Sequence, residues 1–257
     1  MTFPFYIEIG PLSLHPHFLF ELLAYFIGFR LYLWTRRKEQ MPKDKAIWVI
    51  IGAILGAAIG SKILYWFEEP MVTIENILNL HYLMEGKTIV GGLLGGLIGV
   101  EVAKKVIGWK NSTGDDIVIP LAIGMAIGRV GCFLTGLPDR THGTPTTWVT
   151  GVNFGDGIAR HPTQLYEVAL LLLFIVFVAI LKRNNLILWE GLLFQLFMIT
   201  YLSFRFVIEF IKPIPTSYGV LNHIQIAAIL GLLYYVYLLS RKWKGRMKHA
   251  ESSVHHV

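Results

Sequence analysis

Charged residues are scarce in this chain of 257 residues. Asp, Glu, Lys and Arg make up 16% of it, hydrophobic residues make up 54%, and the mean hydropathy is +0.55. Because soluble globular domains carry about 25% charged residues, this composition excludes an ordinary soluble protein of this length. It indicates a chain that crosses a membrane several times.

Cysteine and metal-binding spacings are also nearly absent. The single cysteine, Cys132, excludes a disulfide framework. The pairs His15 and His17, and His255 and His256, have no cysteine or carboxylate at ligand spacing along the chain. The sequence therefore predicts neither a metal nor another cofactor. Its first segment lacks a basic start and a small-residue cleavage site, so no removable signal peptide is expected.

Long apolar runs are what the chain does contain. A helix needs about 20 apolar residues to cross the hydrocarbon core, and a backbone in lipid must satisfy its own hydrogen bonds. The sequence therefore predicts an all-α polytopic membrane protein, a single integral-membrane domain over 1–257. Seven runs are long enough, namely 15–34, 46–67, 88–107, 116–136, 163–181, 187–211 and 220–240.

Basic residues gather beside alternate loops. Fifteen Lys and Arg residues lie at the loops after the first, third, fifth and seventh runs, against four at the other loops. Because loops rich in Lys and Arg stay in the cytoplasm, the N-terminus is predicted outside and the C-terminus in the cytoplasm. The net charge of +6 follows from this pattern and predicts no nucleic-acid partner. The basic tail, 241–248, is interpreted as an anchor that contacts anionic lipid.

The two predicted outside loops are long, unlike the inside ones. Residues 68–87 can hold a short helix around VTIENILNLHYLME. Residues 137–161 are dense in Gly, Pro, Thr and Asp, which predicts turns and short extended pieces. This asymmetry indicates an extracytoplasmic working face.

Glycines recur at four-residue steps in three of the runs. Small residues at this spacing let helix backbones approach closely, so tight helix packing is predicted. A backbone that lines a ligand groove would use the same pattern. The glycines are Gly52, Gly56 and Gly60 in the second run, Gly91, Gly95 and Gly99 in the third, and Gly124 and Gly128 in the fourth.

Six charged side chains fall in the outer halves of the predicted helices. A lone charge inside a membrane costs at least about 2.5–3.5 kcal/mol on insertion scales. One interpretation is a structural ion-pair network, with Arg205 and Glu209 paired along one helix face. The other is a cavity for an anionic lipid headgroup, because the arginine fork donates two parallel hydrogen bonds to phosphate. The six are Glu21, Lys62, Arg129, Glu167, Arg205 and Glu209.

Two motifs surround these charges. RHPTQLYE, residues 160–167, starts a helix at its proline and supplies His161, an imidazole that is either structural or a titratable group at the membrane surface. GMAIGRVGCFLTG, residues 124–136, sets Arg129 between glycines, with Cys132 about one turn later. That cysteine is either a small apolar residue or a nucleophile activated by a positive neighbour.

With these motifs the chain resembles the bacterial phosphatidylglycerol–prolipoprotein diacylglyceryl transferases over nearly its whole length. The resemblance is carried by GGLLGGLIG in the third run, GRVGCFLTG in the fourth, RHPTQLYE entering the fifth and YLSFRFVIEF in the sixth. It implies transfer of diacylglyceryl from phosphatidylglycerol to the lipobox cysteine thiol of exported precursors, with release of glycerol phosphate. It places this reaction at the outer leaflet of a bacterial plasma membrane, without a cofactor.

The resemblance also implies residue roles. Arginines would hold the lipid phosphate and stabilise its charge as it leaves, and a carboxylate or imidazole would take the thiol proton. The catalytic residues implied are Arg129, Arg205, His161, Glu167, Glu209 and Tyr201. The substrate-binding residues are Arg129, Arg205, Lys62, Gln164, Tyr166, Glu21 and Cys132.

Several positions depart from the family pattern. Val90 stands where the family has a His, Cys132 where it has an Asn, and Leu137 where it has a Glu. Lys62 replaces an arginine, and Glu21 aligns with a tyrosine. These changes remove polar partners expected at the reaction centre. Glu21 as a replacement base and a different acceptor are therefore both open.

Two other functions fit the same residues. A related diacylglyceryl transferase with another acceptor would keep the arginines for the headgroup. A non-catalytic protein that binds or transports anionic lipid would need cations but no base beside them. Transport also needs a polar path through both leaflets, and Arg30 is the one cation assigned to the inner half of the predicted helices. That distribution favours chemistry at one face.

Overall fold

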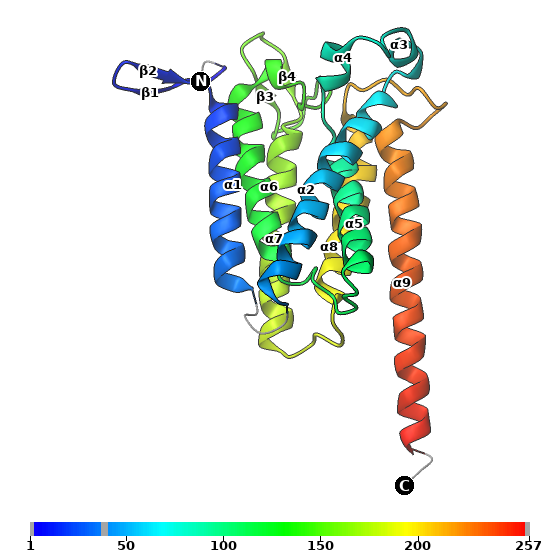
Figure 1. Cartoon of the computed structure of the whole chain (residues 1–257). Coiled ribbons are helices and arrows are strands. Elements are labelled where there is room, and N and C mark those ends of the chain that lie inside the picture. Colours follow the sequence, from blue (N-terminus) through cyan, green and yellow to red (C-terminus); the bar gives the residue numbers. More distant parts are fainter. Residues whose placement is uncertain (1–2, 37–40, 255–257) are drawn as a thin grey trace. The chain divides into compact units, whose positions relative to one another are not determined.

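The computed structural model describes residues 3–36 and 41–254, which are mainly helical (Figure 1). Residues 37–40 of the predicted cytoplasmic loop and 255–257 of the tail lie outside this description. The chain divides into two compact parts, each with its own packing. One consists of Met1–Gln40, Ser112–Phe194 and Val207–Ile214, and the other of Met41–Asn111, Gln195–Phe206 and Pro215–Val257. The single domain over 1–257 therefore stays a prediction.

Three long helices build the first part. Helix α1, Pro16–Thr35, starts at a proline, whose fixed backbone angle suits a first helical position. Helix α6, Val118–Thr135, ends at Gly136, whose positive φ of 74° favours glycine. Helix α6 packs against both α1 and α7, Thr163–Arg183 (Figure 1). The helix that carries the GRVGCFLTG motif is thus the central one of this part.

Short elements complete the first part. Strands β1, Ile7–Ile9, and β2, Leu12–Leu14, form a hairpin that the all-α prediction missed. The loop predicted over 137–161 does hold turns and short extended pieces. They are the 3-10 turn η1, Leu137–Asp139, and strands β3, Val152–Asn153, and β4, Ala159–Arg160. A second 3-10 turn, η2, spans Glu209–Ile211.

Close backbone contact between two helices organises the second part. Helices α2, Lys43–Trp66, and α5, Ile89–Val106, pack along their lengths, and α9, His223–Val254, packs on α5. A Cβ added at any of six glycines would lie within 3 Å of the partner helix's backbone. The predicted tight packing is therefore confirmed for these runs. The facing pairs are Gly52 with Gly99, Gly56 with Gly95, and Gly60 with Gly91.

The same prediction holds for only one of the two glycines in α6. A Cβ at Gly124 would lie 3.3 Å from the carbonyl oxygen of Ala24 in α1. A Cβ at Gly128 would meet no described atom within 4 Å. Helix packing therefore explains Gly124 but not Gly128, which precedes Arg129.

Between α2 and α5, the segment predicted to be helical contains the short helices α3, Pro70–Glu75, and α4, Leu80–Met84.

Helix α8, Leu192–Ile208, begins five residues after the start of the predicted run. Gly191 has a φ of 87°, which lies outside the helical region. The carboxylate of Asp115 accepts hydrogen bonds from the backbone N–H groups of Gly191, at 2.7 Å, and Phe194, at 3.1 Å. Because the first N–H groups of a helix lack partners within the helix, this carboxylate stabilises the later start.

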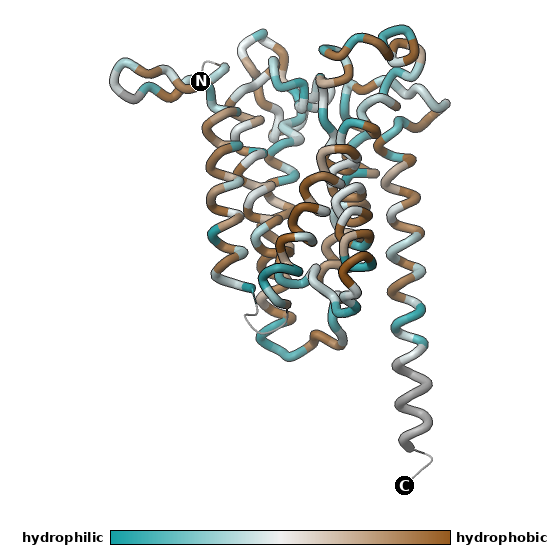
Figure 2. Tube along the Cα trace, in the orientation of Figure 1, coloured by the Kyte–Doolittle hydropathy of each residue, from teal (hydrophilic) through white to brown (hydrophobic). Residues whose placement is uncertain are grey.

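Six described helices are long and apolar enough to cross a membrane: α1, α2, α6, α7, α8 together with η2, and α9 as far as Gly245. Figure 2 shows mainly hydrophobic residues along α1, α2 and α6. The third predicted run is the helix α5, but it carries Glu101, Lys104 and Lys105 and is not among the six. A mainly helical protein with several membrane-length helices is therefore confirmed, whereas seven crossings and the orientation of the termini stay predictions.

Candidate active site

A buried ion pair joins two of the sequence motifs in the first part. The Nε atom of Arg129 in α6 lies 2.8 Å from Oε1 of Glu167 in α7. Only 7% of the arginine side chain and 3% of the glutamate side chain are exposed. A buried charge is stable when an opposite charge compensates it. The structure therefore brings together two predicted catalytic residues that are 38 positions apart.

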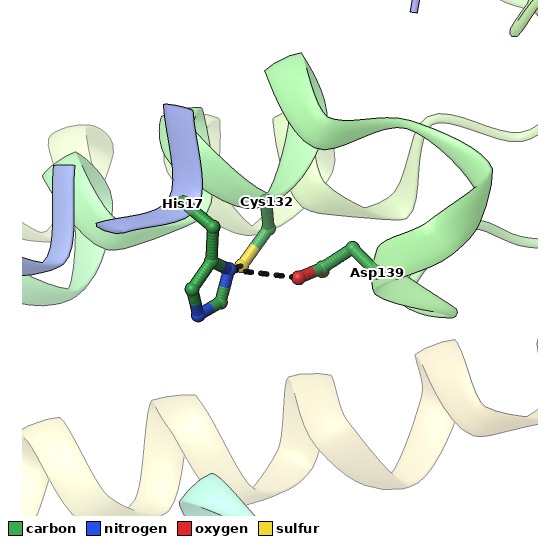
Figure 3. Close-up of side chains that lie close together, drawn as sticks. All are labelled: His17, Cys132 and Asp139. Carbon is green, nitrogen blue, oxygen red and sulfur yellow. Dashed lines mark hydrogen bonds and ion pairs between the residues drawn. The ribbon is translucent and has the colours of Figure 1, made fainter. Parts of the chain in front are cut away.

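A second cluster lies one helical turn from Arg129. The Sγ atom of Cys132 is 4.0 Å from Nη1 of Arg129 and 4.0 Å from Nδ1 of His17 in α1. The same Nδ1 is 2.9 Å from Oδ1 of Asp139 in η1 (Figure 3). On its other side, Nε2 of His17 is 3.6 Å from Oε2 of Glu21. His17 thus lies between the predicted site residues Glu21 and Cys132.

Asp139 connects this cluster to the start of α7. The hydroxyl of Thr141 donates to Oδ2 of Asp139 and accepts a 3.0 Å hydrogen bond from Nε2 of Gln164. The hydroxyl of Thr163 donates to the carbonyl of Thr141. Burial raises the pKa of the Asp139 carboxyl, but the hydrogen bonds from His17 and Thr141 outweigh it, so the net pKa lies below the ordinary value. The carboxyl is therefore held in its charged form.

The other residues of RHPTQLYE fix the neighbouring loop. Nδ1 of His161 lies 3.1 Å from the hydroxyl of Tyr166, which also shares a 2.7 Å hydrogen bond with Thr150. The His161 ring packs edge to face against Trp148, with 5.5 Å between ring centroids. The His161 imidazole is thus buried and linked through the Tyr166 hydroxyl to Thr150.

Glu209 is the remaining predicted site residue of the first part. It begins η2, directly after α8 ends, and its side chain is fully buried. Its Oε1 atom lies 3.8 Å from Nζ of Lys212. The buried carboxylate therefore has a cation within ion-pair distance in its own part.

Three predicted site residues belong to the second part. Arg205 and Tyr201 are buried in α8, and the Tyr201 ring stacks on Phe197 with 5.9 Å between centroids. The ammonium of Lys62 donates to the carbonyl oxygens of Met84, Glu85 and Gly86 just after α4. Cations are favourable at a helix C-terminus, so Lys62 has a structural role whether or not it also binds substrate.

Val90, also in the second part, is completely buried at the start of α5, and Leu137 lies in η1. Neither supplies the polar group that the family pattern has at that position.

Sequence reasoning missed His17, Asp139 and Thr141. The argument against a metal at His17 considered only neighbours along the chain, whereas its cysteine and carboxylate partners are 115 and 122 residues away. One signal was available. Asp139 lies two residues after Leu137, and the family pattern has a Glu at the position of Leu137. No spacing rule connects Cys132 or Asp139 to the first helix.

Membrane-length helices that carry a buried arginine–glutamate pair beside a half-buried histidine and cysteine define an integral membrane protein with a polar site. Comparison with known families gives the particular class. Residues 4–241 match the model of the family described as prolipoprotein diacylglyceryl transferase, and the chain belongs to this family.

Similar proteins agree with this assignment. One from Bordetella parapertussis is 31% identical over 237 residues, covering 85% of each chain. One from Aliivibrio fischeri strain ES114 is 31% identical over 245 residues, covering 89% of this chain and 84% of its own. One from Nitratidesulfovibrio vulgaris strain DP4 is 31% identical over 242 residues, covering 85% and 84%. All three are named phosphatidylglycerol–prolipoprotein diacylglyceryl transferase.

Proposed function

We propose that the protein transfers the diacylglyceryl group of phosphatidylglycerol to the lipobox cysteine of exported prolipoproteins and releases glycerol phosphate. The family match over 4–241 and the names of the relatives support this reaction. The observation that carries it is the 2.8 Å contact between Arg129 and Glu167, which joins two family motifs at one buried cation. A guanidinium held in this way suits a phosphate headgroup.

In this proposal Arg129 and Arg205 bind the lipid phosphate. Glu167 contacts the Nε atom of Arg129, and the Nη1 atom of Arg129 lies 4.0 Å from Sγ of Cys132. The phosphate would then sit near the cluster of His17 and Cys132. The remaining residues proposed to complete catalysis are His161, Tyr201 and Glu209, and those proposed to position the substrates are Glu21, Lys62, Cys132, Gln164 and Tyr166.

The chemistry is a displacement at carbon. The acceptor thiol gives its proton to a base, for which Glu21 is our candidate because it lies beside His17. The thiolate sulfur then forms a bond to the diacylglyceryl carbon, while the bond from that carbon to the phosphate oxygen breaks. The electron pair leaves with glycerol phosphate, which departs as a dianion. Positive charge from the arginines stabilises the charge that develops on the leaving phosphate.

We further propose that the chain crosses the plasma membrane seven times, with the N-terminus outside and the site at the outer leaflet. Helix α5 would be the seventh crossing. Its Lys104 is buried and lies 2.8 Å from Glu101, so each charge has a partner near the predicted cytoplasmic end. The excess of basic residues at alternate loops supports the orientation.

A reconstituted transfer assay tests the function. Purified protein is mixed with phosphatidylglycerol and a lipobox-cysteine peptide, and the peptide mass is followed. We expect a diacylglyceryl thioether that is lost in Arg129→Ala and Arg205→Ala. It should persist in the matched control Arg140→Ala, whose side chain is exposed. Lipid consumed without peptide modification would instead indicate a different acceptor, and lipid bound without turnover would indicate a binding or transport protein.

A further inference from the structure

Three side chains of different chemistry converge on one point in the first part. They are His17 from α1, Cys132 from α6 and Asp139 from η1. Their donor atoms Nδ1, Sγ and a carboxylate oxygen all lie within 4.8 Å of one another. Figure 3 shows the sulfur and the carboxylate oxygen at the same ring nitrogen. Nitrogen, sulfur and oxygen donors at this separation are a ligand set that zinc accepts.

The geometry differs from that of an activated cysteine nucleophile. In such a site one ring nitrogen faces the thiol and the other faces the carboxylate that orients the ring. Here Nδ1 of His17 is the atom nearest to both Cys132, at 4.0 Å, and Asp139, at 2.9 Å. A shared centre between three donor atoms is the arrangement of metal ligands, not of a proton relay.

The surrounding residues orient the three donors. The other ring nitrogen of His17 faces Glu21 at 3.6 Å, as the second nitrogen of a metal-bound histidine commonly faces a carboxylate. The second oxygen of Asp139 accepts from Thr141. Nη1 of Arg129 donates toward the sulfur of Cys132, 4.0 Å away. Each ligand therefore has the kind of outer partner that fixes a metal site.

The distances fit a small ion after modest adjustment. Zinc bonds of about 2.0–2.3 Å in a tetrahedron separate the ligand atoms by roughly 3.3–3.6 Å. The two measured separations, 2.9 Å and 4.0 Å, lie on either side of that range. The His17 side chain is 32% exposed, so a molecule can approach the cluster. Three protein ligands and one open position are typical of catalytic zinc.

We propose that His17, Cys132 and Asp139 bind a zinc ion, and that its open position binds the acceptor thiol as a thiolate. The second half rests on the proposed transferase function. A thiol that coordinates zinc loses its proton, which passes to Glu21 or through it to water. The sulfur then forms the bond to the diacylglyceryl carbon as glycerol phosphate leaves. The metal would supply acceptor-side chemistry near Leu137, which lies in the same 3-10 turn as Asp139 and has no polar side chain.

Metal content tests the first half without reference to activity. The purified full-length protein is stripped with a chelator, incubated with zinc in slight excess, desalted, and measured by elemental mass spectrometry. We expect about one zinc per chain, and at least a tenfold weaker affinity in His17→Ala and Cys132→Ser. The matched control is His15→Ala, because the His15 ring packs on Tyr6 outside the cluster. A wild-type protein that retains no zinc, or a His17→Ala protein that binds it equally well, would overturn the proposal.

Cobalt tests the second half. Cobalt-loaded protein should show a sulfur-to-cobalt charge-transfer band that is absent in Cys132→Ser. The band should grow when a lipobox-cysteine peptide is added, but not when the matching serine peptide is added. A cobalt spectrum that does not change when the cysteine peptide is added would refute thiol binding at the open position of the metal. Full transfer by verified zinc-free protein would remove the metal from the reaction and leave the proposed function intact, whereas no transfer by zinc-loaded protein would count against the function itself.

Discussion

Two buried side chains, Arg129 and Glu167, compensate each other's charge across 2.8 Å between α6 and α7. Removing one partner of a buried pair leaves the other charge in a low-dielectric setting, which typically costs about 3–5 kcal/mol. Replacing both by apolar side chains of similar volume is often neutral. The stability role and the phosphate-binding role of Arg129 can therefore be separated.

Arg129→Met should lower the free energy of unfolding by about 3–5 kcal/mol, because the Glu167 carboxylate loses this partner. The double variant Arg129→Met/Glu167→Leu should recover most of that stability. Both should transfer diacylglyceryl at least about 100-fold more slowly, the usual effect of removing one group that stabilises transition-state charge. Unfolding in mixed micelles and the peptide assay give the two readouts. A stable double variant with normal transfer would show that Arg129 is purely structural.

The individual site residues were predictable from the sequence to an unequal degree. Arg129 and Glu167 follow from their motifs and from the cost of placing charge in an apolar helix. Their pairing does not, because spacing within one helix says nothing about which helix lies beside it. His17 and Asp139 were missed for the same reason, since their contact joins segments that are 122 residues apart.

At the scale of elements, helices α2 and α5 show what small residues do. Their glycines face each other in three pairs, and each backbone occupies the space that a side chain would need. The four-residue spacing predicted which face of each helix packs closely. It did not predict that α2 and α5 pair with each other, nor that a Cβ at Gly128 in α6 would meet no described atom within 4 Å.

Adjacent glycines of α5 give a matched pair of variants. A Cβ at Gly95 would lie 2.8 Å from the Cα of Gly60 and closer still to the Gly56 carbonyl. Among the described residues, a Cβ at Gly96 would meet no atom nearer than 3.5 Å. Gly95→Ala should therefore lower the free energy of unfolding by about 1–3 kcal/mol through overpacking. Gly96→Ala should change it little. Equal unfolding midpoints for the two variants in mixed micelles would refute close α2–α5 packing.

The start of α7 holds the loop over 137–161 through the hydroxyl of Tyr166. Tyr166→Phe removes its hydrogen bonds to His161 and Thr150 and should cost about 0.5–1.5 kcal/mol per bond lost. In a double-mutant cycle with Thr150→Ala, the two changes should be less than additive, because they share one bond. The unfolding free energies of the four proteins measure this coupling. Strict additivity would mean that the hydroxyls do not interact.

At the scale of the whole molecule, the sequence predicted most helices to within a few residues, because long apolar runs carry a strong signal. The start of α8 was wrong, since Asp115 and Gly191 set it locally. The seventh crossing stays a prediction, because the charges of α5 weaken its apolar signal. The sequence did not predict the short hairpin of β1 and β2.

Cysteine labelling tests the orientation of the chain. In a Cys132→Ser background, the variants Thr147→Cys and Lys242→Cys place one thiol each at exposed positions in the loop and the tail. An impermeant maleimide should label Thr147→Cys in intact cells and Lys242→Cys only after the membrane is permeabilised, because the basic tail is predicted to be cytoplasmic. The reverse pattern would place the candidate site on the cytoplasmic face.

The central claim is that the diacylglyceryl carbon moves from phosphate oxygen to sulfur. Phosphatidylglycerol labelled with carbon-13 only in its headgroup glycerol follows both products of that step in one experiment. We predict that the lipobox peptide gains an unlabelled diacylglyceryl mass, while an equal amount of labelled glycerol phosphate appears. Label on the peptide, or peptide modification without release of labelled glycerol phosphate, would contradict the account.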